Sequence, residues 1–190
     1  MKKEIEIIDG HVSSSYFWIQ PVRIIDWTDT NDIDAVAEMS SAEISIEEDD
    51  VAQYLTPYLY KYFDEELEAN KKRVDACGFE WYLTYNFYTF DSVRKIVQDI
   101  KDTIEALSAG RENEYTAELR KKRGTATYQL IYSRDMSEEE IKEYNANRPE
   151  VDDTEAELLI DFYRRFVYRM EYMMTVGKEK GYDLISFMGP

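Results

Sequence analysis

The sequence predicts a single α+β domain, in which amphipathic helices cover a mainly antiparallel or mixed sheet. Its 190 residues suffice for one hydrophobic core. Residues 79–87 alternate between large apolar and polar side chains, as a half-buried strand does. Residues 91–107 and 155–176 carry apolar side chains at helical spacing. Alternating strands favour an antiparallel sheet, because strands of parallel sheets are usually apolar on both faces.

The N-terminal part of the chain indicates short strands. Weak alternation predicts a strand over residues 3–8, and an Asp-Gly dipeptide predicts a turn after it. Residues 15–25 are apolar on both faces but are interrupted by Pro21, so we expect two short strands or one bent strand. A brief strand is expected over residues 43–46.

Residues 51–67 predict a helix whose apolar stripe is rich in tyrosine. Acidic residues precede this stripe and basic residues follow it, and both placements suit the helix dipole. Pro57 lies inside the pattern. It should either kink the helix or take the first position of a second helix that Thr56 caps.

Residues 78–110 show the clearest pattern in the chain, a strand that runs directly into a helix. The period changes from two to that of a helix at Asp91, which can cap the helix start, and Gly110 can end it. We expect a core built from these two elements: Phe79, Trp81, Leu83, Phe87, Ile96, Ile100 and Ile104.

The C-terminal part predicts further elements around one long helix. Residues 125–132 alternate as a strand, and a short helix should begin near Ser137. A helix over residues 155–176 would be about 33 Å long and would end at Gly177. A final strand is expected over residues 182–188. The long helix should add Phe162, Phe166 and Met170 to the core.

The residues that carry most enzyme and metal chemistry are scarce. One histidine (His11) and one cysteine (Cys77) cannot supply the clustered ligands of a zinc site, and neither has a neighbouring partner that would activate a nucleophile. Seven scattered glycines form no phosphate-binding loop. We therefore predict no catalytic residue, no metal and no other cofactor. An enzyme that uses a carboxylate pair stays open, because a pair cannot be singled out among forty acids.

The net charge of −17 is unevenly distributed. Residues 26–68 contain fourteen acids and one lysine, which gives this segment −13 of the total. Such acidity opposes binding to nucleic acid and anionic lipid and favours a basic partner. No apolar run is long enough to span a membrane, and no signal peptide is evident. We therefore expect a cytoplasmic protein that binds neither nucleic acid nor membrane.

Tyrosines add to the character of the acidic segment. Tyr60 points away from its helix's apolar stripe, and Tyr82 and Tyr88 lie on the polar face of the predicted central strand. Exposed acids and tyrosines together suit fast, salt-sensitive association with a basic surface. We predict a binding protein that docks a basic protein, most concretely an inhibitor of a basic enzyme such as an immunity protein against a nuclease toxin. The predicted partner-binding residues are Asp49, Asp50, Tyr60, Asp64, Glu65, Glu66, Glu68, Tyr82 and Tyr88.

Another class of function also fits the sequence. A structural or self-associating role, as a homo-oligomer, would need an apolar patch and no dependence on charge. The acids of residues 47–50 head a helix, where its dipole favours them, and the others can simply keep the protein soluble. Arg164, Arg165 and Arg169 lie off the apolar stripe of the long helix, and we expect them to pair with acids of neighbouring elements.

Overall fold

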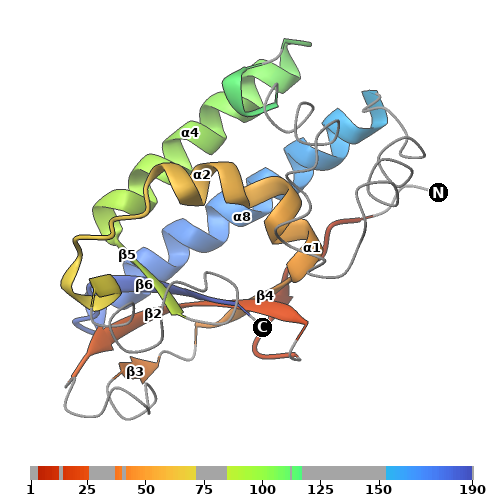
Figure 1. The fold of residues 1–190 in the computed structure, drawn as a ribbon. Coiled ribbons are helices and arrows are strands. Elements are labelled where there is room, and N and C mark those ends of the chain that lie inside the picture. Colours follow the sequence, from red (N-terminus) through yellow and green to blue (C-terminus); the bar gives the residue numbers. More distant parts are fainter. Residues whose placement is uncertain are drawn as a thin grey trace, which may run out of the picture.

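The computed structural model describes residues 4–12, 15–25, 37–39, 42–71, 85–111, 113–116 and 153–189. Six strands form one sheet: β1 (Ile8–Asp9), β2 (Tyr16–Ile24), β3 (Ala37–Met39), β4 (Ile44–Glu47), β5 (Tyr85–Thr89) and β6 (Leu184–Met188). The helices are α1 (Glu48–Asp50), the π-helical η2 (Val51–Leu55), α2 (Thr56–Lys61), α4 (Phe90–Ser108) and α8 (Asp153–Glu179). Figure 1 shows α2, α4 and α8 on one side of the sheet, which confirms the α+β class.

Strand β2 lies at the centre of the sheet. The strand order is β1-β4-β2-β6-β5, β3 pairs with the end of β2, and each of these pairings is antiparallel. Ile19 of β2 lies opposite Ile44 on one side and Phe187 on the other. The last strand of the chain is thus inserted between β2 and β5.

Pro21 lies inside one continuous strand, not at a break between two. It pairs with Ile185 of β6, while the neighbour on the other side of β2 changes from β4 at Ile19 to β3 at Val22. Pro21 falls in that interval, where its missing N–H can face an unpaired part of the ladder. Of the two alternatives expected from the sequence, two short strands is therefore wrong, and residues 16–24 form one strand.

The main core lies between the sheet and the helices. Phe17, Ile19, Ile185 and Phe187 point from the sheet toward the helices, because alternate residues of a strand share a face. The predicted apolar stripes of α4 and α8 meet them. Buried helix side chains in this core include Ile96, Ile100, Phe162, Phe166 and Met170, as expected, whereas Ile104 is half-buried.

The sequence predicted the C-terminal end of α4 correctly but assigned the wrong residue to its N-cap. Thr89, not Asp91, caps the helix, since its Oγ1 accepts a hydrogen bond from the Ser92 N–H at 3.1 Å. Gly110 ends the helix as expected, with a φ of +64° that lets the Arg111 N–H donate to the Ala106 carbonyl at 2.8 Å.

Pro57 interrupts its helix as predicted. The chain winds as a π-helix over η2 and returns to an α-helix at Thr56, so that Pro57 occupies the first turn of α2. The Thr56 hydroxyl donates back to the Val51 carbonyl at 3.2 Å and does not cap α2. The helix ends at Lys61, earlier than the apolar pattern had indicated.

Helix α8 passes through Gly177, where the sequence had predicted its end. A Cβ at this position would lie 2.9 Å from Phe90 Cζ and 3.1 Å from Pro21 Cβ. The glycine therefore allows α8 to approach α4 and β2 closely. The positive φ of Gly181, +76°, instead accompanies the turn toward β6.

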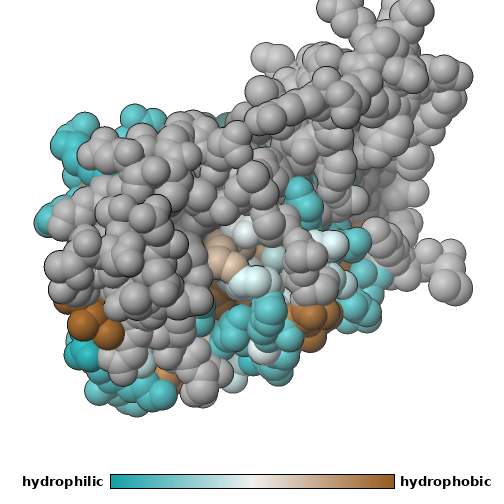
Figure 2. Space-filling view, turned by 60° about the horizontal axis from the view of Figure 1, so that its bottom comes forward, coloured by the Kyte–Doolittle hydropathy of each residue, from teal (hydrophilic) through white to brown (hydrophobic). Residues whose placement is uncertain are grey.

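The sheet also buries side chains on the face away from the helices. Phe87 lies opposite Ser186, and Ser186 lies opposite Gln20, and all three are buried. A second apolar cluster on this face contains Val22, Ala69, Phe87 and Leu184. Figure 2, seen from below the sheet, shows mainly hydrophilic described residues at the surface and separate small hydrophobic patches.

Several predictions fall outside the described residues or are only partly matched. The strand expected over residues 3–8 pairs only at Ile8–Asp9. The first part of the strand at residues 79–84, the strand at 125–132 and the helix near Ser137 lie outside the described residues. Among the described helices, none is both long and apolar enough to cross a membrane.

Candidate functional site

The four carboxylates of residues 64–68 lie on a turn that follows α2. We call this segment the acidic turn. Asp64, Glu65, Glu66 and Glu68 are all exposed. Lys71 is the nearest lysine that follows them, and its Nζ pairs with Glu66. The acidic turn therefore presents four carboxylates to solvent, one of which is paired with a lysine.

Hydrogen bonds within the acidic turn, and from the residues that follow it, stabilise its backbone. The Asp64 Oδ1 accepts a hydrogen bond from the Glu66 N–H at 3.0 Å, and the Asn70 Nδ2 donates to the Asp64 carbonyl at 2.8 Å. Leu67 and Ala69 pack into the second apolar cluster beside Phe87. The carboxylates thus project from a backbone that is already ordered.

Tyr60 supplies an aromatic surface one turn before the acidic turn. Its side chain is 50% exposed, as the sequence predicted, whereas Tyr58, the other tyrosine of α2, is fully buried. Partial burial raises the pKa of Tyr60 above its usual value, so the phenol stays neutral near pH 7.

Two of the predicted partner-binding residues are buried, so the sequence misplaced them. Tyr88 is 1% exposed, because the supposedly polar face of β5 packs under the helices: its ring contacts Phe187, and its hydroxyl donates to the Leu59 carbonyl at 3.2 Å. Asp50 is 6% exposed, since β4 leads directly into α1 and carries the start of the helix against the core. Tyr82 and the side chain of Asp49 lie outside what the structure describes.

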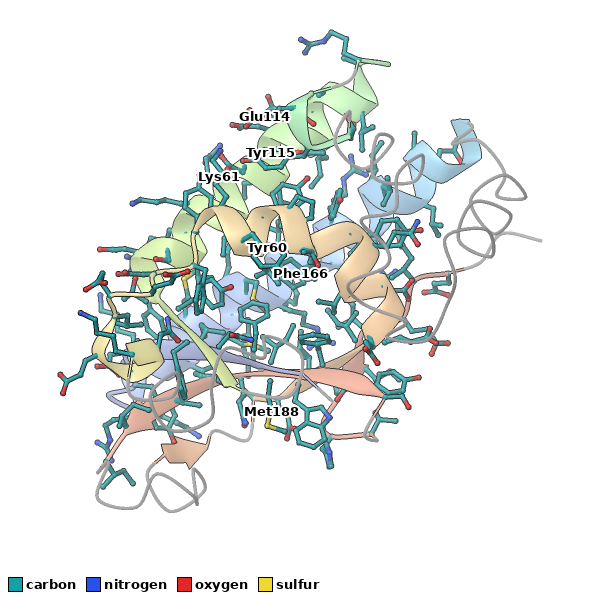
Figure 3. All side chains as sticks on the ribbon, in the orientation of Figure 1. Tyr60, Lys61, Glu114, Tyr115, Phe166 and Met188 are labelled. Atoms are coloured by element: carbon teal, nitrogen blue, oxygen red, sulfur yellow. The ribbon has the colours of Figure 1, made fainter. Side chains whose placement is uncertain are left out.

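A second polar cluster joins α2, α4 and residues 113–116. Asp99 of α4 is its centre: the Asp99 Oδ2 accepts hydrogen bonds from Lys61 Nζ at 3.0 Å, from the Tyr62 hydroxyl at 2.6 Å and from the Tyr115 hydroxyl. Lys61 also contacts the Tyr115 hydroxyl and Glu114. Figure 3 shows Lys61, Glu114 and Tyr115 gathered where the end of α2 meets α4, with Tyr60 apart from them.

The cluster continues inward through Tyr58. Its ring stacks on Tyr115, with centroids 4.2 Å apart, and its hydroxyl donates to the Thr103 Oγ1 at 2.9 Å. Thr103 in turn donates to the Asp99 carbonyl and accepts from the Asn113 amide. The inner part of the cluster is buried, whereas Lys61 and Glu114 are exposed.

Four ionisable groups of this cluster, namely Asp99, Lys61, Tyr58 and Tyr115, have pKa values shifted away from neutrality. Burial alone would raise the pKa of Asp99, but the three hydrogen bonds that it accepts outweigh burial and lower its pKa. Hydrogen bonds to Tyr115 and Asp99 raise the pKa of Lys61. Burial raises the pKa of Tyr58 to about 12, and burial with the bond to Asp99 raises that of Tyr115. Near pH 7 the cluster therefore holds its protons in place.

This arrangement suits a structural fastening of α2 to α4, not proton transfer. A general acid or base works best with a pKa near the working pH, and all four of these pKa values move away from neutrality. The sequence did not predict this cluster, because Lys61 is 38 residues from Asp99 and 54 from Tyr115 along the chain. Only the helical spacing of Tyr54, Tyr58 and Tyr62 gave a signal.

The sequence also drew attention to His11, to the arginines of α8 and to Cys77. His11 is exposed, and its ring meets Trp18 edge-on at 3.8 Å. Arg165 pairs with Glu4 and Asp161, and Arg169 pairs with Asp9, as expected, whereas Arg164 forms no ion pair with the described residues. Within the described part of the chain, no group of three His, Cys, Asp or Glu side chains could hold a metal ion. Cys77 lies outside it.

Comparison with known proteins gives no relative. No protein family, curated protein or solved structure matches this chain. The functional proposal therefore depends on the residues alone.

Proposed function

We propose that this protein is an acidic binding protein whose acidic turn docks a basic protein partner. One observation carries the proposal: residues 64–68 display four exposed carboxylates on a turn that is fastened to the sheet. An inhibitor of a basic enzyme, such as an immunity protein against a nuclease toxin, is the most concrete form of this function.

The order of the acidic turn supports the proposal. A segment that is already fixed loses little conformational entropy on binding, so more of the interaction energy appears as affinity. The backbone bonds of Asp64 and the anchoring of Leu67 and Ala69 provide this order. Dense charge of one sign also raises the rate of encounter with an oppositely charged surface. Tyr60 adds an exposed ring of the kind that dominates many protein interfaces.

The test compares two double variants with the same change in charge. Glu65→Lys with Glu66→Lys reverses the acidic turn, whereas Glu105→Lys with Glu179→Lys reverses two exposed acids elsewhere. Each protein is used as bait in cell extract at low and high salt. We expect wild type and the control to retain the same basic protein at low salt only, and the acidic-turn variant to lose it.

Two results would contradict the proposal. Capture of the same proteins by all three baits would show that the acidic turn is not the contact. Absence of any basic protein among those retained at low salt would remove the proposed class of partner. Circular dichroism of each variant confirms that the fold is intact before capture.

A further inference from the structure

Helix α8 exposes an aromatic stripe that the proposed function does not use. Tyr168 is 66% and Tyr172 is 50% exposed. Arg164 lies one turn before Tyr168, is also exposed, and forms no ion pair with the described residues. Residues four apart share a helix face, so these three side chains form one stripe. Tyrosine and arginine are the residues most enriched where protein interfaces carry their binding energy.

The stripe faces away from both the core and α2. Helix α2 packs on the other side of α8, where the ring of Tyr58 meets that of Tyr163 at 5.8 Å. Tyr163 and Tyr168 are five residues apart, which places them about 140° apart around the helix. One edge of the stripe is bounded by the pair between Lys101 and Glu171. The other edge is bounded by Arg165, which donates to the Ile5 carbonyl at 2.8 Å.

We propose that this stripe is the contact of a two-fold homodimer, in which α8 packs antiparallel on α8 of a second copy with Tyr168 at the centre. In such a pair, residues before Tyr168 on one helix meet residues after Tyr168 on the other along the same edge. Arg164 and Glu171 share one edge, so each Arg164 meets Glu171 of the second copy. Arg165 and Tyr172 share the other edge, so each Arg165 meets a tyrosine ring. The two-fold axis forms both contacts twice.

The charges on this face are compatible with self-association. The net charge of −17 repels a second copy. The middle of α8, however, is balanced: its three arginines and Lys101 lie beside four acids, namely Asp161, Glu171, Glu4 and Asp9. At physiological ionic strength the Debye length is about 8 Å, which screens the distant acids. The stripe is therefore where two copies meet with little repulsion and with matched charges.

The experiment is sedimentation equilibrium of the full chain over a range of concentrations at physiological salt. Wild type should show a reversible monomer–dimer equilibrium. Arg164→Glu and Glu171→Arg should each weaken the dimer about tenfold or more, because each places like charges opposite one another twice. An equimolar mixture of the two variants should dimerise again, because both contacts then join opposite charges. Lys95→Glu, which makes the same reversal of charge as Arg164→Glu at an exposed position on α4, should leave the equilibrium unchanged.

Other outcomes would overturn the inference. A wild type that stays monomeric at every concentration excludes the dimer. A dimer that both single variants leave intact uses a different surface. Single variants that weaken the dimer without recovery in the mixture exclude the antiparallel register. Because no other protein takes part, none of these results bears on the acidic turn.

Discussion

The side-chain amide of Asn70 takes the place of a neighbouring strand beside Phe87. The Asn70 Nδ2 donates to the Phe87 carbonyl and the Asn70 Oδ1 accepts from the Phe87 N–H, both at 2.9 Å. The same Nδ2 donates to the Asp64 carbonyl. Strand β5 ends the strand order, so this amide satisfies backbone groups for which the described strands offer no partner. One buried side chain thus connects the acidic turn to the edge of the sheet.

Asn70→Ala should destabilise the protein by about 3 kcal/mol, because it leaves buried backbone groups of Phe87 without hydrogen bonds. Urea denaturation followed by circular dichroism measures the change. Gln98→Ala is the control: it removes an amide that bonds Asp102 on the exposed surface of α4, and should cost less than about 0.5 kcal/mol. Equal effects of the two substitutions would refute the role assigned to Asn70.

Gly177→Ala should also be destabilising, although alanine favours helices by about 1 kcal/mol. The added Cβ would press on the ring of Phe90 and on Pro21. The ring of Pro21 is bonded to the backbone of β2, so it can shift less than a free side chain. Overpacking of this kind costs about 1 to 3 kcal/mol, which we expect to exceed the gain in propensity. Thermal unfolding reports the net effect.

Replacing Phe90, whose ring lies against Gly177, by the smaller leucine tests the same contact independently. The double variant Gly177→Ala with Phe90→Leu should lose less than the sum of the two single losses, because leucine frees the space that Cβ requires. Strictly additive losses would mean that the two side chains do not collide.

Asp99→Asn should lower stability near pH 7 by about 2 kcal/mol, since hydrogen bonds to a charged acceptor are lost. The folded state lowers the pKa of Asp99 below its usual 3.8, so the ionised group contributes stability above pH 3.8. That contribution disappears as the pH falls through the folded-state pKa. The difference in unfolding free energy between wild type and variant should be constant from pH 7 to 5 and shrink at lower pH. A difference that does not change with acid would contradict the account.

Tyr58→Phe tests the opposite end of the pH scale. Burial raises the pKa of Tyr58 from 10.0 to about 12, so the neutral phenol contributes stability that is complete below pH 10 and is lost as the pH rises to 12. Relative to the variant, wild type should lose about 3 kcal/mol over this interval, at about 1.4 kcal/mol for each pKa unit.

Helices and strands that follow from the local spacing of apolar residues were predictable from the sequence. The stripe of α8, the step from β5 into α4 and the strand β6 all follow local periodicity, and the structure confirms them. The order of the strands was not predictable, because it depends on which distant segments pair. The failure at Tyr88 has a specific cause: alternation shows that two faces differ, but not that both are covered.

Among the candidate site residues, the exposed ones were predictable from the sequence, whereas the buried polar contacts were not. The acids of the acidic turn and Tyr60 were identified correctly as exposed, because they follow or oppose an apolar helical stripe. Asn70 and Asp99 gave no signal, since polar residues in a helix are usually solvated. Their importance depends on contacts with Phe87 and Tyr115, each more than fifteen residues away along the chain.

The position of β6 between β2 and β5 affects how the chain must fold during its synthesis. Until residues 184–188 leave the ribosome, β2 lacks the partner of its Trp18–Val22 stretch, and β5 has no described strand to join. Pairing of strands more than 160 residues apart along the chain is slow. Until it occurs, β2 and β5 of the nascent chain keep exposed edges that can aggregate. A chain that stalls or is cleaved before residue 184 could therefore still pair β1, β4, β2 and β3, but would lack the strand that joins β5 to them.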